Sequence, residues 1–191
     1  MSYANFNDAP PQSERTTEYS VIPDGTIAAV RLNIKPGGYN SDAQGWSGDY
    51  ATKSATTGSI YLNCVYEILS SKHKGRKVFG TIGLHSPKGP RWGQMGRSYI
   101  RAILGSANGI TADDNSSKAQ DFRCIDGLGD LEGLAFVARI DVEKDAKGEQ
   151  KNAINMAIVP PHHEYQKHKP KFQQLPVEND DESTYYEDAP F

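Results

Sequence analysis

A chain of 191 residues is long enough for one domain with a hydrophobic core, but a hydrophobic content of 37% is low for a chain packed throughout. The longest apolar run, residues 134–138, is far too short for a membrane-spanning helix, and the first twenty residues lack the basic and apolar regions of a signal peptide. Cys64 and Cys124, sixty residues apart, suggest no disulfide framework. We therefore expect reduced thiols in a cytoplasmic protein.

The net charge of −3 is unevenly distributed. Residues 173–191 contain no lysine or arginine and six acidic residues: Glu178, Asp180, Asp181, Glu182, Glu187 and Asp188. The remaining 172 residues carry 21 basic and 18 acidic residues, a net charge of +3, and residues 35–101 alone carry +7. A basic body followed by an acidic tail indicates a nucleic-acid-binding protein more strongly than either charge alone.

The first predicted strand follows a polar segment, residues 1–20, that contains Pro10-Pro11, shows no periodicity and predicts a flexible arm. The strand begins at Gly25 and has alternating apolar residues that define a buried face: Ala28, Val30, Leu32 and Ile34. Arg31 lies on its opposite face.

Residues 36–58 show no hydrophobic periodicity, yet they contain Tyr39, Trp46 and Tyr50. Loops longer than about 12–15 residues are usually functional or disordered. One interpretation is a mobile finger that closes over a nucleic-acid strand, with Trp46 or Tyr50 stacking on bases and Lys53 near a phosphate. In the other, Trp46 folds back as a lid on the core.

Residues 59–84 predict a β-hairpin with one apolar and one mixed face. The apolar face alternates through both halves: Ile60, Leu62, Cys64, Tyr66 and Ile68, then Val78, Gly80, Ile82 and Leu84. Between them lies a polar turn in which Gly75 can adopt a positive φ. The mixed face and its turn carry candidate DNA-binding residues: Tyr61, Lys72, Lys74, Arg76, Lys77 and Phe79. Bases stack on aromatic rings and phosphates bind cations, so this pattern favours a single-stranded nucleic-acid site that Arg31 joins if the first strand pairs alongside. The alternative is an ordinary solvated hairpin.

The second half of the body predicts one helix and two strands. The helix starts after Pro90, ends near Gly105 or Gly109, and packs a face containing Trp92 and Met95 on the sheet. A loop with a short helical turn at residues 117–123 follows. The last two strands cover residues 134–142 and 152–159, the second burying Met156, and Pro160-Pro161 ends the fold.

His162, His163 and His168 are the only residues that suggest a metal site, but no cysteine or carboxylate stands at a ligand-like spacing from them. The sequence contains no glycine-rich phosphate loop, nucleophile elbow or HExxH element. We therefore expect no metal, no cofactor and no catalytic residue.

The predicted order β-β-β-α-β-β is that of a mainly β OB-fold, a five-stranded barrel with one helix between strands three and four. Its domain would span residues 21–161, between the arm (1–20) and a disordered acidic tail (162–191). In this fold the second and third strands and the loops between strands 1–2 and 4–5 bind nucleic acid. An SH3-like barrel and a helix-capped sandwich are the alternatives.

The last seven residues, YYEDAPF, follow ENDDE. This ending resembles the acidic C-terminal tip of single-stranded-DNA-binding proteins of bacteria and phages, although Ala189 replaces the bulkier aliphatic residue usual before Pro-Phe. The body, from IPDGT at residue 22 to SKHKGRKVF at residues 71–79, is similar to small single-stranded-DNA-binding proteins of phages and integrated elements.

The resemblance implies sequence-nonspecific binding of single-stranded DNA in replication or recombination of a phage or mobile element, in the cytoplasm of its bacterial host and without enzymatic activity. It also implies that the tip, with Asp188, Pro190 and Phe191, recruits replication or recombination proteins. From the charges alone, we expect the six tail carboxylates to compete with DNA for the basic face. The main rival interpretation is an OB-like adaptor that binds protein, and an enzyme such as a nuclease ranks third. Oligomeric state and a preference between DNA and RNA stay open.

Overall fold

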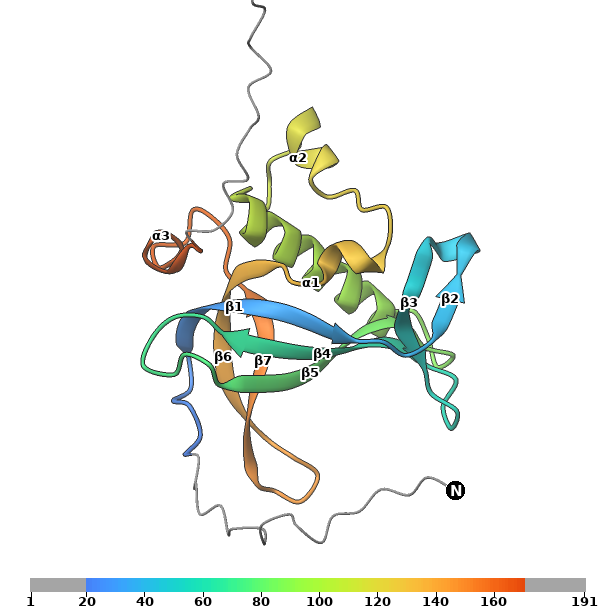
Figure 1. Ribbon diagram of the computed structural model, residues 1–191, viewed down its shortest axis with the longest axis horizontal. Helices are drawn as coiled ribbons and strands as arrows, with labels where there is room; N and C mark the ends of the chain where they lie inside the picture. The colour runs from blue at the N-terminus through green and yellow to red at the C-terminus, as the bar shows by residue number, and fades with distance from the viewer. Residues whose placement is uncertain (1–19, 171–191) are drawn as a thin grey trace, which may run out of the picture.

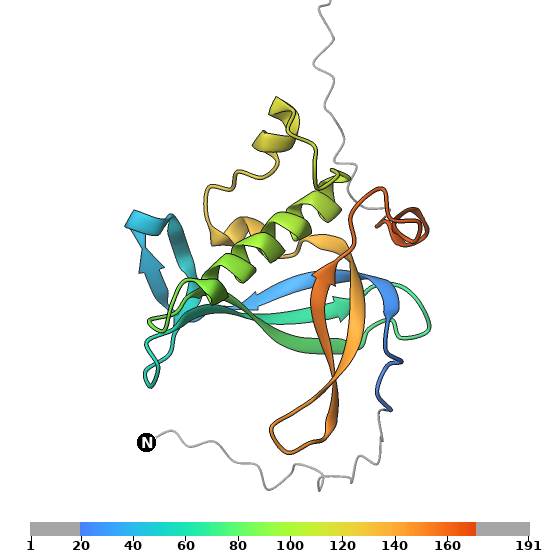
Figure 2. The same ribbon diagram turned by 180° about the vertical axis from the view of Figure 1, so that it is seen from behind.

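The structure is a computed structural model that describes residues 20–170. In this part of the chain seven strands form one curled antiparallel sheet, with helix α1 (Arg91–Asn108) lying across one of its sides (Figures 1 and 2). The predicted mainly β architecture is confirmed. No helix within the described residues is long and apolar enough to span a bilayer.

The other strands and helices have boundaries close to those that the sequence predicts for most of them. The strands are β1 (Thr26–Lys35), β2 (Tyr39–Ser41), β3 (Trp46–Lys53), β4 (Ile60–Ile68), β5 (Lys77–His85), β6 (Ala135–Lys144) and β7 (Gln150–Ala157). The other helices are α2 (Ser117–Asp121), α3 (Tyr165–His168) and the 3-10 turns η1 (Asp42–Gln44) and η2 (Leu128–Leu131). The predicted hairpin, central helix and helical turn are confirmed at nearly the expected positions.

Strand β4 is the centre of the sheet. It pairs with β5 along one edge, while β1 and then β3 share its other edge. β1 also pairs with β6, and β6 with β7. The sheet curls into a half-barrel, which brings β5 into contact with β7.

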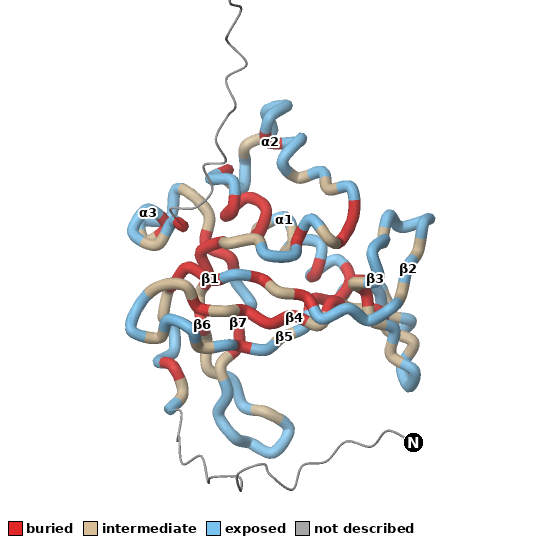
Figure 3. The backbone as a smooth tube through the Cα atoms, viewed as in Figure 1, coloured by how far each residue is buried: buried red, intermediate tan, exposed pale blue. Residues whose placement is uncertain are grey.

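The core lies between the inward face of the sheet and α1. Successive residues of a strand point to opposite faces, and the predicted inward residues of β1 and β4 are all buried (Figure 3): Ala28, Val30, Leu32, Ile34, Ile60, Leu62, Cys64, Tyr66 and Ile68. Alternation therefore predicted correctly which face of the hairpin points away from the core.

Residues 36–58 are not the structureless loop that the sequence predicts. They form the β2–β3 hairpin, which projects at one end of the sheet (Figure 1). β1 ends before Pro36, which has no N–H for a ladder, and Ala51 of β3 then pairs with Leu62 of β4. The pattern was missed because Ala51 is the only buried residue of β3, so no hydrophobic alternation marks this strand.

Two methionines expected in the core are exposed instead. α1 approaches β5 through Gly93 and Gly96, where an added Cβ would overlap the backbone of β5. Met95, about 100° around the helix from Gly96, consequently faces outward and is 60% exposed. In β7 the register shifts opposite Arg139 and Ile140, so that Met156 turns outward despite the alternation.

The folded body extends beyond the predicted boundary at residue 161. Tyr165 of α3 is 1% exposed, and its hydroxyl donates a hydrogen bond to the carbonyl oxygen of Ser106 at 2.6 Å. Pro170 is also buried. Residues 162–170 therefore belong to the body, whereas residues 1–19 of the predicted arm (1–20) and residues 171–191 of the predicted tail lie outside the described residues.

Candidate nucleic-acid interface

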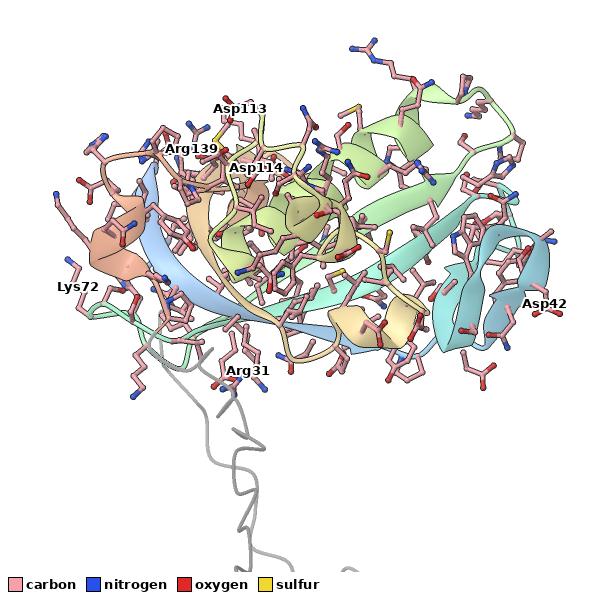
Figure 4. All side chains as sticks on the ribbon, turned by 90° about the horizontal axis from the view of Figure 1, so that it is seen from above. Arg31, Asp42, Lys72, Asp113, Asp114 and Arg139 are labelled. Atoms are coloured by element: carbon pink, nitrogen blue, oxygen red, sulfur yellow. The ribbon has the colours of Figure 1, made fainter. Side chains whose placement is uncertain are left out.

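The side of the sheet opposite α1 carries a set of mostly polar and aromatic side chains, which we call the outer face. Residues directly opposite each other in antiparallel strands point to the same side, and the registers place ten residues there: Arg31, Asn33, Lys35, Tyr61, Asn63, Val65, Glu67, Lys77, Phe79 and Thr81. Figure 4 shows Arg31 projecting from β1 away from α1. Arg31, Tyr61, Lys77 and Phe79 therefore share one surface, as predicted.

Phe79 lies near the middle of the outer face. It is 61% exposed, the largest value for any large hydrophobic side chain that the structure describes. The Nζ of Lys35 lies 5.4 Å from the centroid of its ring. An accessible ring beside a lysine offers a base a stacking surface and a phosphate a cation.

Near the hairpin turn the outer face carries a row of three charged residues, one on each of three strands. Arg31 is opposite Glu67, which is opposite Lys77. The guanidinium of Arg31 lies 3.7 Å from the Glu67 carboxylate, a partly exposed pair of the kind that contributes about 0–1 kcal/mol. Glu67 offsets one cation, so Arg31, Lys35 and Lys77 together leave the outer face positive.

The β4–β5 turn extends this positive surface beyond the sheet. Lys72 and Lys74 are exposed at its tip, and Figure 4 shows Lys72 pointing outward. Gly75 has φ +82° and its N–H donates to the carbonyl of Ile68 at 2.8 Å, as predicted for the turn. The pKa of His73 is lowered by partial desolvation and then by the charges of Lys72 and Arg76. Cations are thus close enough to disfavour a further positive charge.

Tyr61 lies at the opposite end of the outer face from the turn. Its partner on β5 is Gly83, and its ring centroid is 6.4 Å from that of Trp92 in α1. Trp92 was expected to pack on the sheet, and its ring does lie against Gly83 of β5, beside a predicted site residue. This contact has no signal in the sequence because Tyr61 and Trp92 belong to different elements.

The aromatic residues of the β2–β3 hairpin are placed elsewhere. Tyr39 is opposite Ala51, which faces inward, and its ring lies 5.4 Å from the Nζ of Lys53. Trp46 and Tyr50 are half-buried against the core, and an added Cβ at Gly129 of η2 would meet the Tyr50 ring. The structure brings Tyr39 and Lys53 together, but it does not bring the hairpin aromatics onto the outer face.

Lys35 is the outer-face residue that the sequence analysis missed. It continues the alternation of Arg31 and Asn33 along β1, so the same period-two argument that selected Arg31 could have selected it. It was overlooked because the residues predicted for this strand ended at Ile34, one position earlier.

The described residues also give evidence on metal binding and on thiol reactivity. Among residues 20–170 no group of three or more His, Cys, Asp or Glu side chains is arranged to hold a metal ion. Burial raises the pKa of the Cys64 thiol to about 12, which disfavours the reactive thiolate. The predicted partner-binding residues Asp188, Pro190 and Phe191 lie outside the described part.

No protein-family model matches this chain, and no curated protein is significantly similar to it.

Proposed function

We propose that this protein binds single-stranded DNA without sequence preference and serves replication or recombination of a phage or mobile element. The observation that carries the proposal is the exposed Phe79 ring on a positive strand surface, with Lys35 over the ring. Rings stack on any base and cations follow the backbone, so this chemistry recognises single strands rather than a sequence.

The strand arrangement supports an OB-like architecture for this function. Without the β2–β3 hairpin, the order β1-β4-β5-α1-β6-β7 is that of an OB-fold, and the hairpin occupies the loop between its first two strands. Single strands bind such a fold on its second and third strands, here β4 and β5. These two strands carry Tyr61, Lys77 and Phe79.

The acidic segment would regulate DNA binding and recruit partner proteins. Its six carboxylates (residues 178–188) are complementary to the outer face, and the Pro190-Phe191 tip would offer an apolar ring to a pocket on a replication or recombination protein. A variant lacking residues 173–191 should bind DNA as well or more tightly at low salt and lose partner recruitment. Weaker DNA binding by this variant would contradict the proposed competition.

A titration with oligo-dT at two salt concentrations tests the proposal. Binding should be detected with oligo-dT and with mixed-sequence single strands, and it should weaken as salt rises because phosphate contacts release counterions. Duplex DNA of equal length is the control and should bind more weakly. Failure of single strands to bind at low salt would remove the proposal.

The rival function is a protein-binding adaptor, and one observation favours it. An open pocket of about 430 Å³ lies between α1 and β7, with Met95, Tyr99 and Met156 among its lining residues. Methionine side chains adapt to many partners. An adaptor would show no salt-dependent oligonucleotide binding, and it would bind a protein through this pocket.

A further inference from the structure

Trp92 connects the start of α1 to the outer face. An added Cβ at Gly83 would overlap the indole ring, so a glycine at this position allows the ring to lie directly on β5. Gly83 is opposite Tyr61, and the Tyr61 and Trp92 ring planes are inclined at 54°. Two aromatic rings therefore stand together at the end of the outer face.

The same indole borders an open hollow of about 470 Å³. Lys88 and Arg91 also line this hollow, and both are exposed. Trp92 itself is only half-buried. A tryptophan that served only to pack α1 on β5 would not need an accessible part in a hollow that two cations also line.

The distance between this corner and Phe79 suits a nucleic-acid strand. Phe79 and Gly83 are four residues apart on β5, which corresponds to about 14 Å at roughly 3.4 Å per residue. A stacked strand advances about 3.4 Å per nucleotide. About four nucleotide steps would therefore lead from one aromatic site to the other.

We propose that Trp92 and Tyr61, with Lys88 and Arg91, form a second nucleotide-binding subsite of the single-stranded DNA site. The inference rests on the proposed function and extends the site from the sheet onto the start of α1. One base stacks on the exposed part of the Trp92–Tyr61 pair, and its flanking phosphates bind Lys88 and Arg91. Phe79 holds another base nearer the turn.

Tryptophan fluorescence can locate the strand because the chain contains two tryptophans, Trp46 and Trp92. In Trp46→Phe the remaining indole is that of Trp92, and oligo-dT should quench its fluorescence. In Trp92→Phe only Trp46 remains, and we expect little change. Oligonucleotide binding without a fluorescence change in Trp46→Phe would overturn the subsite and leave the proposed function standing.

Substitution of the two exposed cations, Lys88 and Arg91, provides a second test that does not alter the core. The double variant Lys88→Gln, Arg91→Gln should lose about 1.4 from the log–log salt slope, two contacts at about 0.7 each for single strands. The control is Lys118→Gln, an exposed lysine on α2 away from the sheet, with no change expected. An unchanged slope in the first variant overturns the subsite, whereas absence of binding by the unmodified protein overturns the proposed function itself.

Discussion

The Nζ of Lys35 on β1 lies 5.4 Å from the ring centroid of Phe79 on β5, so a cation covers an exposed ring across the width of β4. A cation over an exposed ring contributes about 0.5–1 kcal/mol. Stacking of a base on the same ring contributes about 1–3 kcal/mol. A base can therefore displace the ammonium, which then becomes available to the adjacent phosphate.

Replacing Phe79 with alanine should weaken oligo-dT binding about tenfold, since one stacking surface worth about 1–3 kcal/mol is lost. The melting temperature should change little because the side chain is mostly exposed. Fluorescence anisotropy with labelled oligo-dT measures the affinity, and circular dichroism measures the stability.

Phe122 is the matched control for this substitution. It is also an exposed phenylalanine with a lysine nearby, the Nζ of Lys118 lying 6.0 Å from its ring centroid, but it follows α2 and lies away from the sheet. Phe122→Ala should leave binding unchanged. Equal losses in both variants would show that exposed rings act nonspecifically and that the outer face is not the site.

Replacing Lys35 with glutamine should weaken oligonucleotide binding at low salt but not at high salt. The loss of one phosphate contact reduces the log–log salt slope by about 0.7 and weakens binding at low salt. At high salt, where phosphate contacts contribute little, the uncovered Phe79 ring should bind a base at least as well as before. Affinities measured across a salt series test this crossover, with Lys118→Gln, which removes the lysine beside the Phe122 ring, as an exposed control.

A uniform loss of affinity at every salt concentration would contradict this role of Lys35. In that case the lysine would act by holding the Phe79 ring in place rather than by binding phosphate.

Much of the outer face could be predicted because strand alternation is a local signal. Ile60, Leu62 and Cys64 mark the buried face of β4, and the position of Tyr61 on the other face follows directly. Contacts between distant elements have no such signal. The Trp92 ring reaches Gly83 only because α1 packs closely on β5 through two glycines, and spacing within the helix does not reveal this contact.

The β2–β3 hairpin shows a different limit. β3 contributes one buried residue, Ala51, so its position depends on the vacant edge of β4 beyond Lys35 and not on its own hydrophobic pattern. A strand that completes an existing sheet edge needs little hydrophobicity, and sequence periodicity then misses it.

The two cysteines should react very differently. Cys124 is exposed, whereas Cys64 is buried and its pKa is raised to about 12, chiefly by desolvation. An aromatic disulfide reagent at pH 8 should modify one thiol per native chain and two in denaturant, and no native thiol in Cys124→Ser. Rapid modification of Cys64 in the native protein would contradict its burial.

The same shift predicts a pH dependence of stability. The pKa of Cys64 in the fold is above its ordinary value of 9.0, so its contribution is present below pH 9 and is lost as pH rises toward 12. The free energy of unfolding should fall less steeply between pH 9 and 11 in Cys64→Ala than in the unmodified protein. Urea unfolding at each pH measures the difference, and parallel curves would contradict it.

The folded body should require residues 162–170. Tyr165 is buried against Val137 and Ile158, and its hydroxyl donates to the carbonyl of Ser106. The Ser106 hydroxyl in turn donates to the carbonyl of Ile158 at 2.6 Å and accepts from the N–H of Val137 at 3.0 Å. α3 therefore covers the Ser106 hydrogen bonds that join α1 to β6 and to the residue after β7.

A variant ending at residue 161 exposes this cluster, and removal of a buried aromatic side chain typically costs about 3–5 kcal/mol. It should unfold at clearly lower urea concentration, whereas a variant ending at residue 170 should match the full chain. Tyr165→Phe, which removes only the hydroxyl, should lose about 0.5–1.5 kcal/mol. Equal midpoints for the variants ending at 161 and 170 would mean that α3 contributes nothing to the body and that the predicted boundary at residue 161 was correct.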